Sequence, residues 1–156
     1  MKKVLFVCLG NICRSPAAEA VFLNLLRKND LANSFIVDSA GTGGWHVGKK
    51  ADYRMRSAAE KRGIIIKSLA RQITSSDLYE FDLIVTMDHD NYSTLQKKTK
   101  TLDPEKVAEI RTMLSYSTKL KITEVPDPYY GGNDGFDYVL DILEDSCESL
   151  LDYLVK

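Results

Sequence analysis

Short apolar runs alternate with helix-like patterns along most of the chain. Residues 4–7 are a continuous apolar run between charged residues and Gly10, a pattern typical of a strand buried on both faces. After Ser15 and Pro16, apolar residues recur at spacings of three and four. This spacing predicts a helix with Ser15 as its N-cap, Pro16 in its first turn and an end near Asn29.

The same alternation continues to the end of the chain. It predicts further strands at residues 35–37, 81–87 and 122–125. Helices are expected at residues 52–62, 90–98, from 103 onward and at 134–154, and a glycine-rich loop at 40–45. Strands that alternate with helices predict a three-layer α/β/α fold with a central four-stranded parallel sheet. Ligands of such folds bind at the carboxyl ends of the strands.

Length and composition fit an ordinary globular protein. The 156 residues predict a single domain, 1–156, and 44% hydrophobic residues suffice for its core. No apolar run approaches the roughly 20 residues that span a bilayer, and the N-terminal run is too short for a signal peptide. The net charge of −1 provides no basic field for nucleic acid. We expect a cytoplasmic monomer with no nucleic-acid partner and no membrane insertion.

The charge is unevenly distributed along the chain. Residues 1–126 carry 20 Lys and Arg against 14 Asp and Glu, whereas residues 127–156 carry one Lys against eight acids. An anion would therefore prefer the first part. Cys8, Cys13 and Cys147 form no CxxC pair, and two histidines do not complete a zinc signature. The sequence therefore predicts neither a metal nor a cofactor. It does predict a reducing compartment.

The segment between the first strand and the first helix carries the candidate chemistry. It consists of Cys8, Leu9, Gly10, Asn11, Ile12, Cys13, Arg14 and Ser15. A tight strand-to-helix loop turns successive backbone N–H groups toward one point, and the helix N-terminus adds partial positive charge. Gly10 and Asn11 suit the positive φ angles of such a loop, and Arg14 can hold two phosphate oxygens. A tetrahedral dianion is the expected ligand of this phosphate-binding loop.

Cys8 is expected at the bottom of the loop. Its positive surroundings favour the thiolate, and a thiolate below a bound phosphate is typical of a phosphatase. A free cysteine is more often a core residue, but Asn11, Arg14 and Ser15 stand in register with Cys8 and favour the catalytic interpretation. Ser15 can both cap the helix and steady the thiolate. A non-catalytic phosphate-binding module is the alternative from another class, although such a module needs no cysteine at position 8.

Residues 7–18 resemble the signature loop of the low-molecular-weight protein tyrosine phosphatases. The likeness covers essentially the whole chain, through Val37-Asp38-Ser39-Ala40-Gly41, Trp45 with Val47-Gly48, Ala70-Arg71-Gln72, Met87-Asp88 and Asp127-Pro128-Tyr129-Tyr130-Gly131. It implies hydrolysis of phosphotyrosine and of small aryl phosphates through a cysteinyl-phosphate intermediate. Phosphotyrosine-containing proteins are then the substrates, and phosphate and related oxyanions are inhibitors.

The resemblance also implies roles for individual residues. Cys8 is the nucleophile and Arg14 the phosphate clamp. Asp127 is the general acid of the first step and the general base of the second, although an Asp between prolines is by itself an ordinary turn residue. Ser39 supports the loop through a hydrogen bond to Asn11.

Further positions follow from the same resemblance. Trp45, Tyr129 and Tyr130 wall a slot for a phenyl ring, although single aromatic residues more often fill cores or surfaces. Cys13 is the redox partner that protects Cys8 in a reversible disulfide.

Two related activities use a similar loop. Phosphoarginine phosphatases tend to have Thr where this chain has Ile12, and an apolar side chain favours a phenyl ester over a guanidinium. Arsenate reductases relay oxidation through further cysteines, but this chain has none between Cys13 and Cys147. Both alternatives are therefore less favoured than the tyrosine phosphatase.

The remaining titratable residues are given no catalytic role. Many animal members of the family have a His where this chain has Ser68, so that support of the loop is absent. His46 is expected beside Trp45 near the rim of the site, exposed rather than catalytic, and His89 is expected at the surface. Cys147 lies on the apolar stripe of the last helix and is expected in the core.

Overall fold

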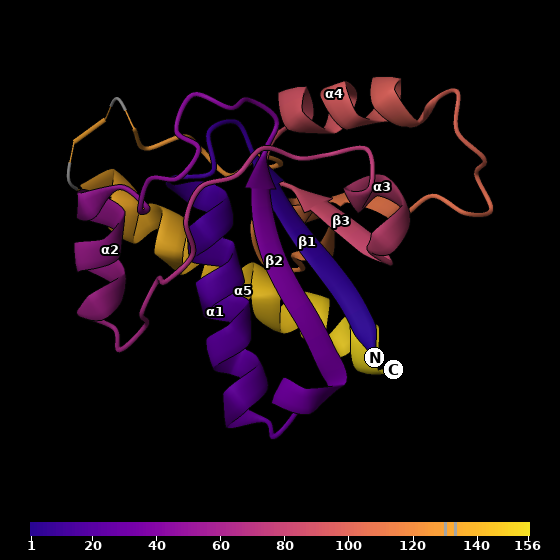
Figure 1. The fold of residues 1–156 in the computed structure, drawn as a ribbon. Helices are drawn as coiled ribbons and strands as arrows, with labels where there is room; N and C mark the ends of the chain where they lie inside the picture. The colour runs from indigo at the N-terminus through magenta and orange to yellow at the C-terminus, as the bar shows by residue number, and fades with distance from the viewer. Residues whose placement is uncertain (130, 133) are drawn as a thin grey trace.

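The computed structural model describes residues 1–129, 131–132 and 134–156. A four-stranded sheet forms its centre, with the strands in the order β2-β1-β3-β4 and each neighbouring pair parallel (Figure 1). The strands are β1 (Lys2–Cys8), β2 (Phe35–Gly41), β3 (Leu83–Thr86) and β4 (Glu109–Thr112). The predicted four-stranded parallel sheet is confirmed.

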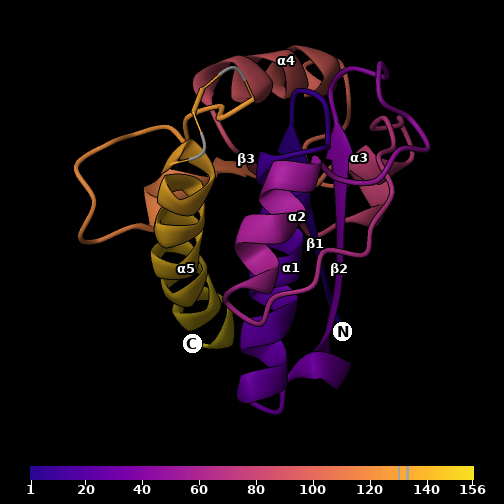
Figure 2. The same ribbon diagram turned by 90° about the vertical axis from the view of Figure 1, so that its left-hand side faces the viewer.

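Helices cover both faces of this sheet. They are α1 (Arg14–Lys28), α2 (Tyr53–Glu60), α3 (Asp77–Glu80), α4 (His89–Thr99) and α5 (Asp134–Val155), with 3-10 turns at Ala32–Ser34 and Met113–Tyr116. α1, α2 and α5 pack together on one face, whereas α3 and α4 lie on the other (Figure 2). The three-layer α/β/α prediction is therefore confirmed.

β1 sends its side chains alternately into two cores. Val4 and Phe6 pack in the core on the side of α1 and α5, and Leu5 and Val7 pack on the side of α3 and α4. All four residues are completely buried. Since both faces of the strand are covered, each position from 4 to 7 is apolar, which explains the continuous run in the sequence.

The strand order places the end of β1 at the centre of the molecule. β1 connects through α1 to β2 on one side, while β3 pairs with its other edge. Connections that diverge in this way leave a crevice at the carboxyl end of the central strands. The loop that follows Cys8 lies at this crevice.

The fourth strand lies earlier in the chain than predicted. β4 is Glu109–Thr112, and the predicted strand at 122–125 is wrong. Val125 makes one backbone hydrogen bond, from its N–H to the Met87 carbonyl oxygen at 2.8 Å. The next residue is Pro126, which has no N–H and cannot continue the pairing.

The helix predicted from residue 103 is also wrong. The Asp103 side chain accepts a hydrogen bond from the backbone N–H of Glu105 at 3.0 Å, and its carbonyl oxygen accepts one from Lys106 at 3.1 Å. An Asp followed by Pro supports such a turn as readily as a helix start. The turn leads directly into β4.

Two boundaries next to the phosphate-binding loop differ from the prediction. α1 begins at Arg14 with Cys13 as its N-cap, so Ser15 is not the cap but lies inside the first turn. β2 extends to Gly41, and the glycine-rich loop starts after it. A Cβ at Gly41 would lie 2.8 Å from the Leu9 carbonyl oxygen, so glycine is required where β2 meets the loop.

Within the described part of the chain, no helix is both long enough and apolar enough to cross a bilayer.

Candidate active site

The loop between β1 and α1 turns several of its carbonyl groups outward. The carbonyl oxygens of Cys8 and Leu9 each accept a hydrogen bond at 2.9 Å from the residues that follow β2. That of Ile12 accepts one at 2.7 Å from Asp52, the N-cap of α2. In a trans peptide the next N–H points the opposite way. The N–H groups of residues 9, 10 and 13 therefore face the concave side of the loop, as an oxyanion site requires.

Asn11 gives the loop its sharp turn. Its φ is 57°, in the left-handed region that Asn tolerates better than most residues. Its side-chain amide donates to Ser15 Oγ at 2.8 Å and to Ser39 Oγ at 3.0 Å, which confirms the predicted Ser39–Asn11 bond. Gly10 does not adopt the positive φ predicted for it. Glycine is favoured there because a Cβ would lie 3.0 Å from Cδ2 of His46.

The Cys8 sulfur lies at the floor of the loop. The residue is only 3% exposed. Ser15 Oγ is 3.0 Å from Sγ, and the Asn11 backbone N–H donates to Sγ at 3.3 Å. Because Asn11 already donates to Ser15 Oγ, the hydroxyl proton is free for Sγ or, at 3.4 Å, for the Ala40 carbonyl oxygen. An ionised sulfur at the shorter distance attracts that proton more strongly.

Arg14 is held from behind by two acceptors. Its Nη1 donates to Asp88 Oδ2 at 2.7 Å and to the Val125 carbonyl oxygen at 3.0 Å. Burial alone would lower the pKa of Arg14, but the negative charges of Cys8, Asp88 and Asp127 outweigh burial and raise the pKa above its ordinary value. The guanidinium is therefore charged and fixed in orientation at the edge of the loop.

The Asp127 carboxylate faces Arg14 from the other side of the site. Its Oδ2 lies 3.6 Å from Arg14 Nη2, and its Oδ1 accepts the backbone N–H of Tyr129 at 3.1 Å. The side chain is 37% exposed. A carboxyl group in this position can reach both a ligand above Cys8 and the surrounding water, as a proton donor and acceptor must.

These groups surround one cavity of about 430 Å³. Its lining consists of Cys8, Leu9, Gly10, Ile12, Cys13, Arg14, Trp45, His46, Asp127 and Tyr129. Trp45 is 69% exposed and its ring covers Gly43, where any Cβ would overlap it. The structure thus brings together the predicted nucleophile, clamp and acid with two of the three predicted aromatic walls. The third, Tyr130, lies outside the described residues.

Comparison with known proteins identifies the family. The model of the low molecular weight phosphotyrosine protein phosphatases matches residues 3–156. The chain belongs to this family. It is 40% identical over 151 residues to the low molecular weight phosphotyrosine protein phosphatase of Homo sapiens. The aligned region covers 97% of this chain and 94% of that protein.

Solved structures of similar proteins agree with this assignment. A protein tyrosine phosphatase from Entamoeba histolytica with Hepes in its active site has a TM-score of 0.93 and 48% identity, covering 99% of this chain and 97% of that one. The Drosophila arginine phosphatase has a TM-score of 0.93 and 35% identity. The match covers 100% of this chain and 99% of that one. The same fold thus carries proteins named for two different phosphate linkages.

Asp88 is a site residue of this phosphatase-family chain that the sequence analysis missed. It follows β3 and is the N-cap of α4, where its Oδ1 accepts the Asn91 backbone N–H at 2.7 Å. Its other oxygen holds Arg14. An acidic residue at the carboxyl end of a central parallel strand was the available signal.

His46 lies near the rim beside Trp45, as expected, and lines the cavity. It is half-buried, packs over Gly10, and its ring centroid is 6.2 Å from that of Tyr129. It therefore forms part of the rim with the aromatic walls. His89 is exposed as expected, with Nε2 3.2 Å from Thr123 Oγ1.

Arg54 in α2 was also missed. Its Nη2 donates to the Tyr129 carbonyl oxygen at 2.9 Å and contacts Asp52 Oδ2 at 3.0 Å. Its guanidinium carbon lies 4.7 Å from the Phe136 ring centroid and 5.6 Å from that of Tyr129. Arg54 thus ties the segment that carries Asp127 to α2 and α5.

The other two cysteines differ in their surroundings. Burial and the negative charges of Asp52 and Cys8 raise the pKa of the Cys13 thiol. Both Cys8 and Cys13 are free thiols in this structure, and the redox role of Cys13 stays a prediction. Cys147 is completely buried in α5, as expected, and burial raises the pKa of its thiol.

Proposed function

We propose that this chain is a protein tyrosine phosphatase that hydrolyses phosphotyrosine and small aryl phosphate monoesters. One observation carries the proposal: the Cys8 sulfur, the Arg14 guanidinium and the Asp127 carboxylate line the same cavity. A nucleophile, an oxyanion clamp and a proton donor are the three groups that metal-free transfer of a phosphoryl group through cysteine requires.

In the first step, the Cys8 thiolate attacks phosphorus and the bond from phosphorus to the phenolic oxygen breaks. Asp127 gives its proton to the departing oxygen, so a neutral phenol leaves. The N–H groups of the loop and Arg14 stabilise the three equatorial oxygens while charge redistributes among them. The product is a cysteinyl phosphate on Cys8.

In the second step, water attacks the cysteinyl phosphate. Asp127, now ionised, takes a proton from this water, and the sulfur leaves as a thiolate with release of inorganic phosphate. The hydrogen bonds of Ser15 and of the Asn11 N–H to Sγ stabilise that leaving thiolate. The charge stabilisation comes from the protein's own donors, so we propose that the reaction needs neither a metal nor a cofactor.

The walls of the cavity support an aromatic substrate. Trp45 and Tyr129 line it, and we propose that they flank the phenyl ring together with Tyr130. Phosphotyrosine-containing proteins are the proposed substrates, and phosphate and related oxyanions the inhibitors. We further propose a cytoplasmic monomer that acts without nucleic acid and without inserting into a membrane.

Turnover of an aryl phosphate in the presence of a chelator tests the mechanism. Cys8→Ser should abolish hydrolysis but keep binding of the phosphate ester, and iodoacetate should modify Cys8 first, as located by mass spectrometry. Cys147→Ala is the matched control, because Cys147 is buried in the core and does not line the cavity, and it should retain turnover. Unchanged turnover in Cys8→Ser would exclude this mechanism.

The phosphoarginine alternative needs its own test. Ile12 lines the cavity and is almost fully buried, and an apolar wall gives a guanidinium no partner. Phosphotyrosine should therefore be turned over faster than phosphoarginine, and Ile12→Thr should shift the ratio toward phosphoarginine. A wild-type preference for phosphoarginine would replace the proposed substrate class.

A further inference from the structure

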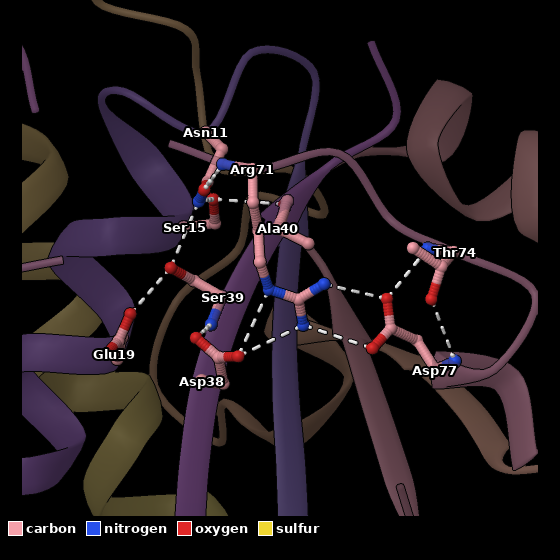
Figure 3. Close-up of polar contacts among 9 residues, drawn as sticks. All are labelled: Asn11, Ser15, Glu19, Asp38, Ser39, Ala40, Arg71, Thr74 and Asp77. Atoms are coloured by element: carbon pink, nitrogen blue, oxygen red, sulfur yellow. Dashed lines mark hydrogen bonds and ion pairs between the residues drawn. The ribbon is translucent and has the colours of Figure 1, made fainter. Parts of the chain in front are cut away.

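The side chain of Asn11 is held at three points, and one of them lies far away in the sequence. Its amide nitrogen serves Ser15 and Ser39, as described above. Its Oδ1 accepts the backbone N–H of Arg71 at 3.0 Å (Figure 3). The three contacts together hold the Asn11 amide, with its nitrogen toward the two serines and its oxygen toward the Arg71 backbone.

The Arg71 side chain is anchored to two elements. Its Nε and Nη2 contact Asp38 Oδ2 on β2 at 3.1 and 3.0 Å. Its Nη1 and Nη2 also donate to the two oxygens of Asp77 at 2.9 and 3.1 Å. Figure 3 shows the guanidinium lying between the two carboxylates. A planar fork held by two acceptors has a defined orientation.

The two carboxylates are themselves fixed. Asp77 accepts the backbone N–H of Thr74 at 2.7 Å, and its side chain is only 7% exposed. Asp38 Oδ1 accepts the backbone N–H of Ser39 at 2.8 Å. The contacts therefore close a ring, from Asn11 to Ser39, to Asp38, to Arg71 and back to Asn11.

The charges explain why this ring is persistent. Burial alone would lower the pKa of Arg71, but Asp77 and Asp38 outweigh burial and raise it, so the guanidinium is charged. Exposed ion pairs contribute little to stability, and Asp38 is 42% exposed. The bidentate contact to the buried Asp77 is the stronger anchor.

We propose that Arg71 is a positioning residue for the phosphate-binding loop, and this proposal rests on the proposed phosphatase function. Asp77 and Asp38 bind the Arg71 side chain. This fixes the Arg71 backbone N–H in the position where it donates to Asn11 Oδ1. That contact keeps Asn11 in its left-handed conformation and aims the Asn11 amide at Ser15, the residue that touches the Cys8 sulfur. Arg71 itself does not touch the substrate.

Kinetics of Arg71→Met test the proposal. A small misplacement of the donors weakens transition-state stabilisation, so kcat for an aryl phosphate should fall about tenfold or more. KM should change less than about threefold, because ground-state binding depends less on exact donor alignment. The inhibition constant of vanadate should rise with the loss in kcat/KM. Arg71→Lys should recover part of kcat, since it keeps the charge but not the fork.

Two further variants serve as a control and as an independent test of the Arg71 proposal. Arg111→Met removes a comparably exposed arginine that pairs with Glu109 on β4, and it should leave kcat and vanadate inhibition within about twofold of wild type. Asp77→Asn breaks the bidentate anchor from the other side and should reproduce the kcat loss. It provides the test if Arg71→Met does not fold. The double variant of Arg71 and Asp77 should be no worse than the more impaired single variant.

The proposal is overturned if folded Arg71→Met has the same kcat and the same vanadate inhibition constant as the Arg111→Met control. If Arg71→Met does not fold, the same result for Asp77→Asn overturns it. It is also overturned if KM alone rises. These results are distinct from a failure of the proposed function, in which the wild type itself has no Cys8-dependent turnover of aryl phosphate.

Discussion

The loop that carries Cys8 and the segment that carries Asp127 face the same cavity but are built differently. The first is buried, with Cys8, Asn11 and Ser15 each at most 3% exposed and bonded to one another. The second presents a partly exposed carboxylate. It is tied down by two arginines, Arg14 at the Val125 carbonyl oxygen and Arg54 at that of Tyr129.

This difference fits the demands of the two chemical roles. A phosphorus atom has one geometry in every substrate, so the groups that bind it gain from being fixed in advance. The proton donor serves both the leaving oxygen and the attacking water, so it gains from access to solvent. Rigid support by internal hydrogen bonds suits the first task, and a partly exposed carboxylate suits the second.

Replacing the clamp should have the largest effect. In Arg14→Lys a point charge replaces the fork that meets Asp88 and the phosphate, and kcat should fall by about 10³-fold. Steady-state assay of an aryl phosphate checks this. Near-normal activity would show that the fixed loop alone binds phosphate well enough.

The acid variant should give a loss that depends on the substrate. Asp127→Asn should slow release of phenols of high pKa by about 10²-fold, because these need a proton. Activated aryl phosphates should lose much less, and a comparison of kcat across a series of leaving groups measures the difference. Equal losses for all substrates would remove Asp127 from the acid role.

Loosening the acid segment should have a smaller effect of the same kind. Arg54→Met removes the bond to the Tyr129 carbonyl oxygen and should lower kcat about fivefold for poor leaving groups only. Arg56→Met, on the same helix, is the matched control, because Arg56 bonds to Ala51 rather than to the acid segment. A uniform loss over all leaving groups would place the effect of Arg54 elsewhere.

The smallest effect concerns stability against acid. Burial alone would raise the pKa of Asp77, but hydrogen bonds from Arg71 and Thr74 outweigh it and lower the pKa. A lowered carboxyl pKa contributes stability that is present above the unfolded value of about 3.9 and is lost as pH falls through the folded value. The free energy of unfolding in urea should therefore depend less on pH for Asp77→Asn than for the wild type, below a pH of about 4. An identical pH dependence would contradict the ion pair.

The sequence was most informative where the signal is local. The eight residues from Cys8 to Ser15 contain the nucleophile, the clamp and the sharp turn, so one motif predicted the floor of the site. β1 and α5 were equally clear, β1 because its apolar run is uninterrupted and α5 because its apolar stripe is long and regular. Glu109–Thr112 was missed because only Ile110 in this short edge strand is buried.

The supports of the site were missed because they join distant parts of the chain. Asp88 reaches Arg14 across 74 positions, Arg54 reaches Tyr129 across 75, and Arg71 reaches Asn11 across 60. Each is a charged residue that looks like solvent-facing surface in its own segment. Asp88 and Arg71 stand in segments that resemble the family, but only the folded topology shows which group each of the three side chains contacts.

The start of α1 has a consequence for the thermal behaviour of the protein. Its N-cap, Cys13, makes no side-chain capping bond within the described part of the chain. An oxyanion bound in the loop would supply the missing cap to the helix dipole, and ligands that bind only the folded state raise its melting temperature. At 100 times its Kd, such a ligand adds about 2.7 kcal/mol to the free energy of unfolding. Differential scanning fluorimetry with phosphate or vanadate would therefore report occupancy of this helix end without any turnover.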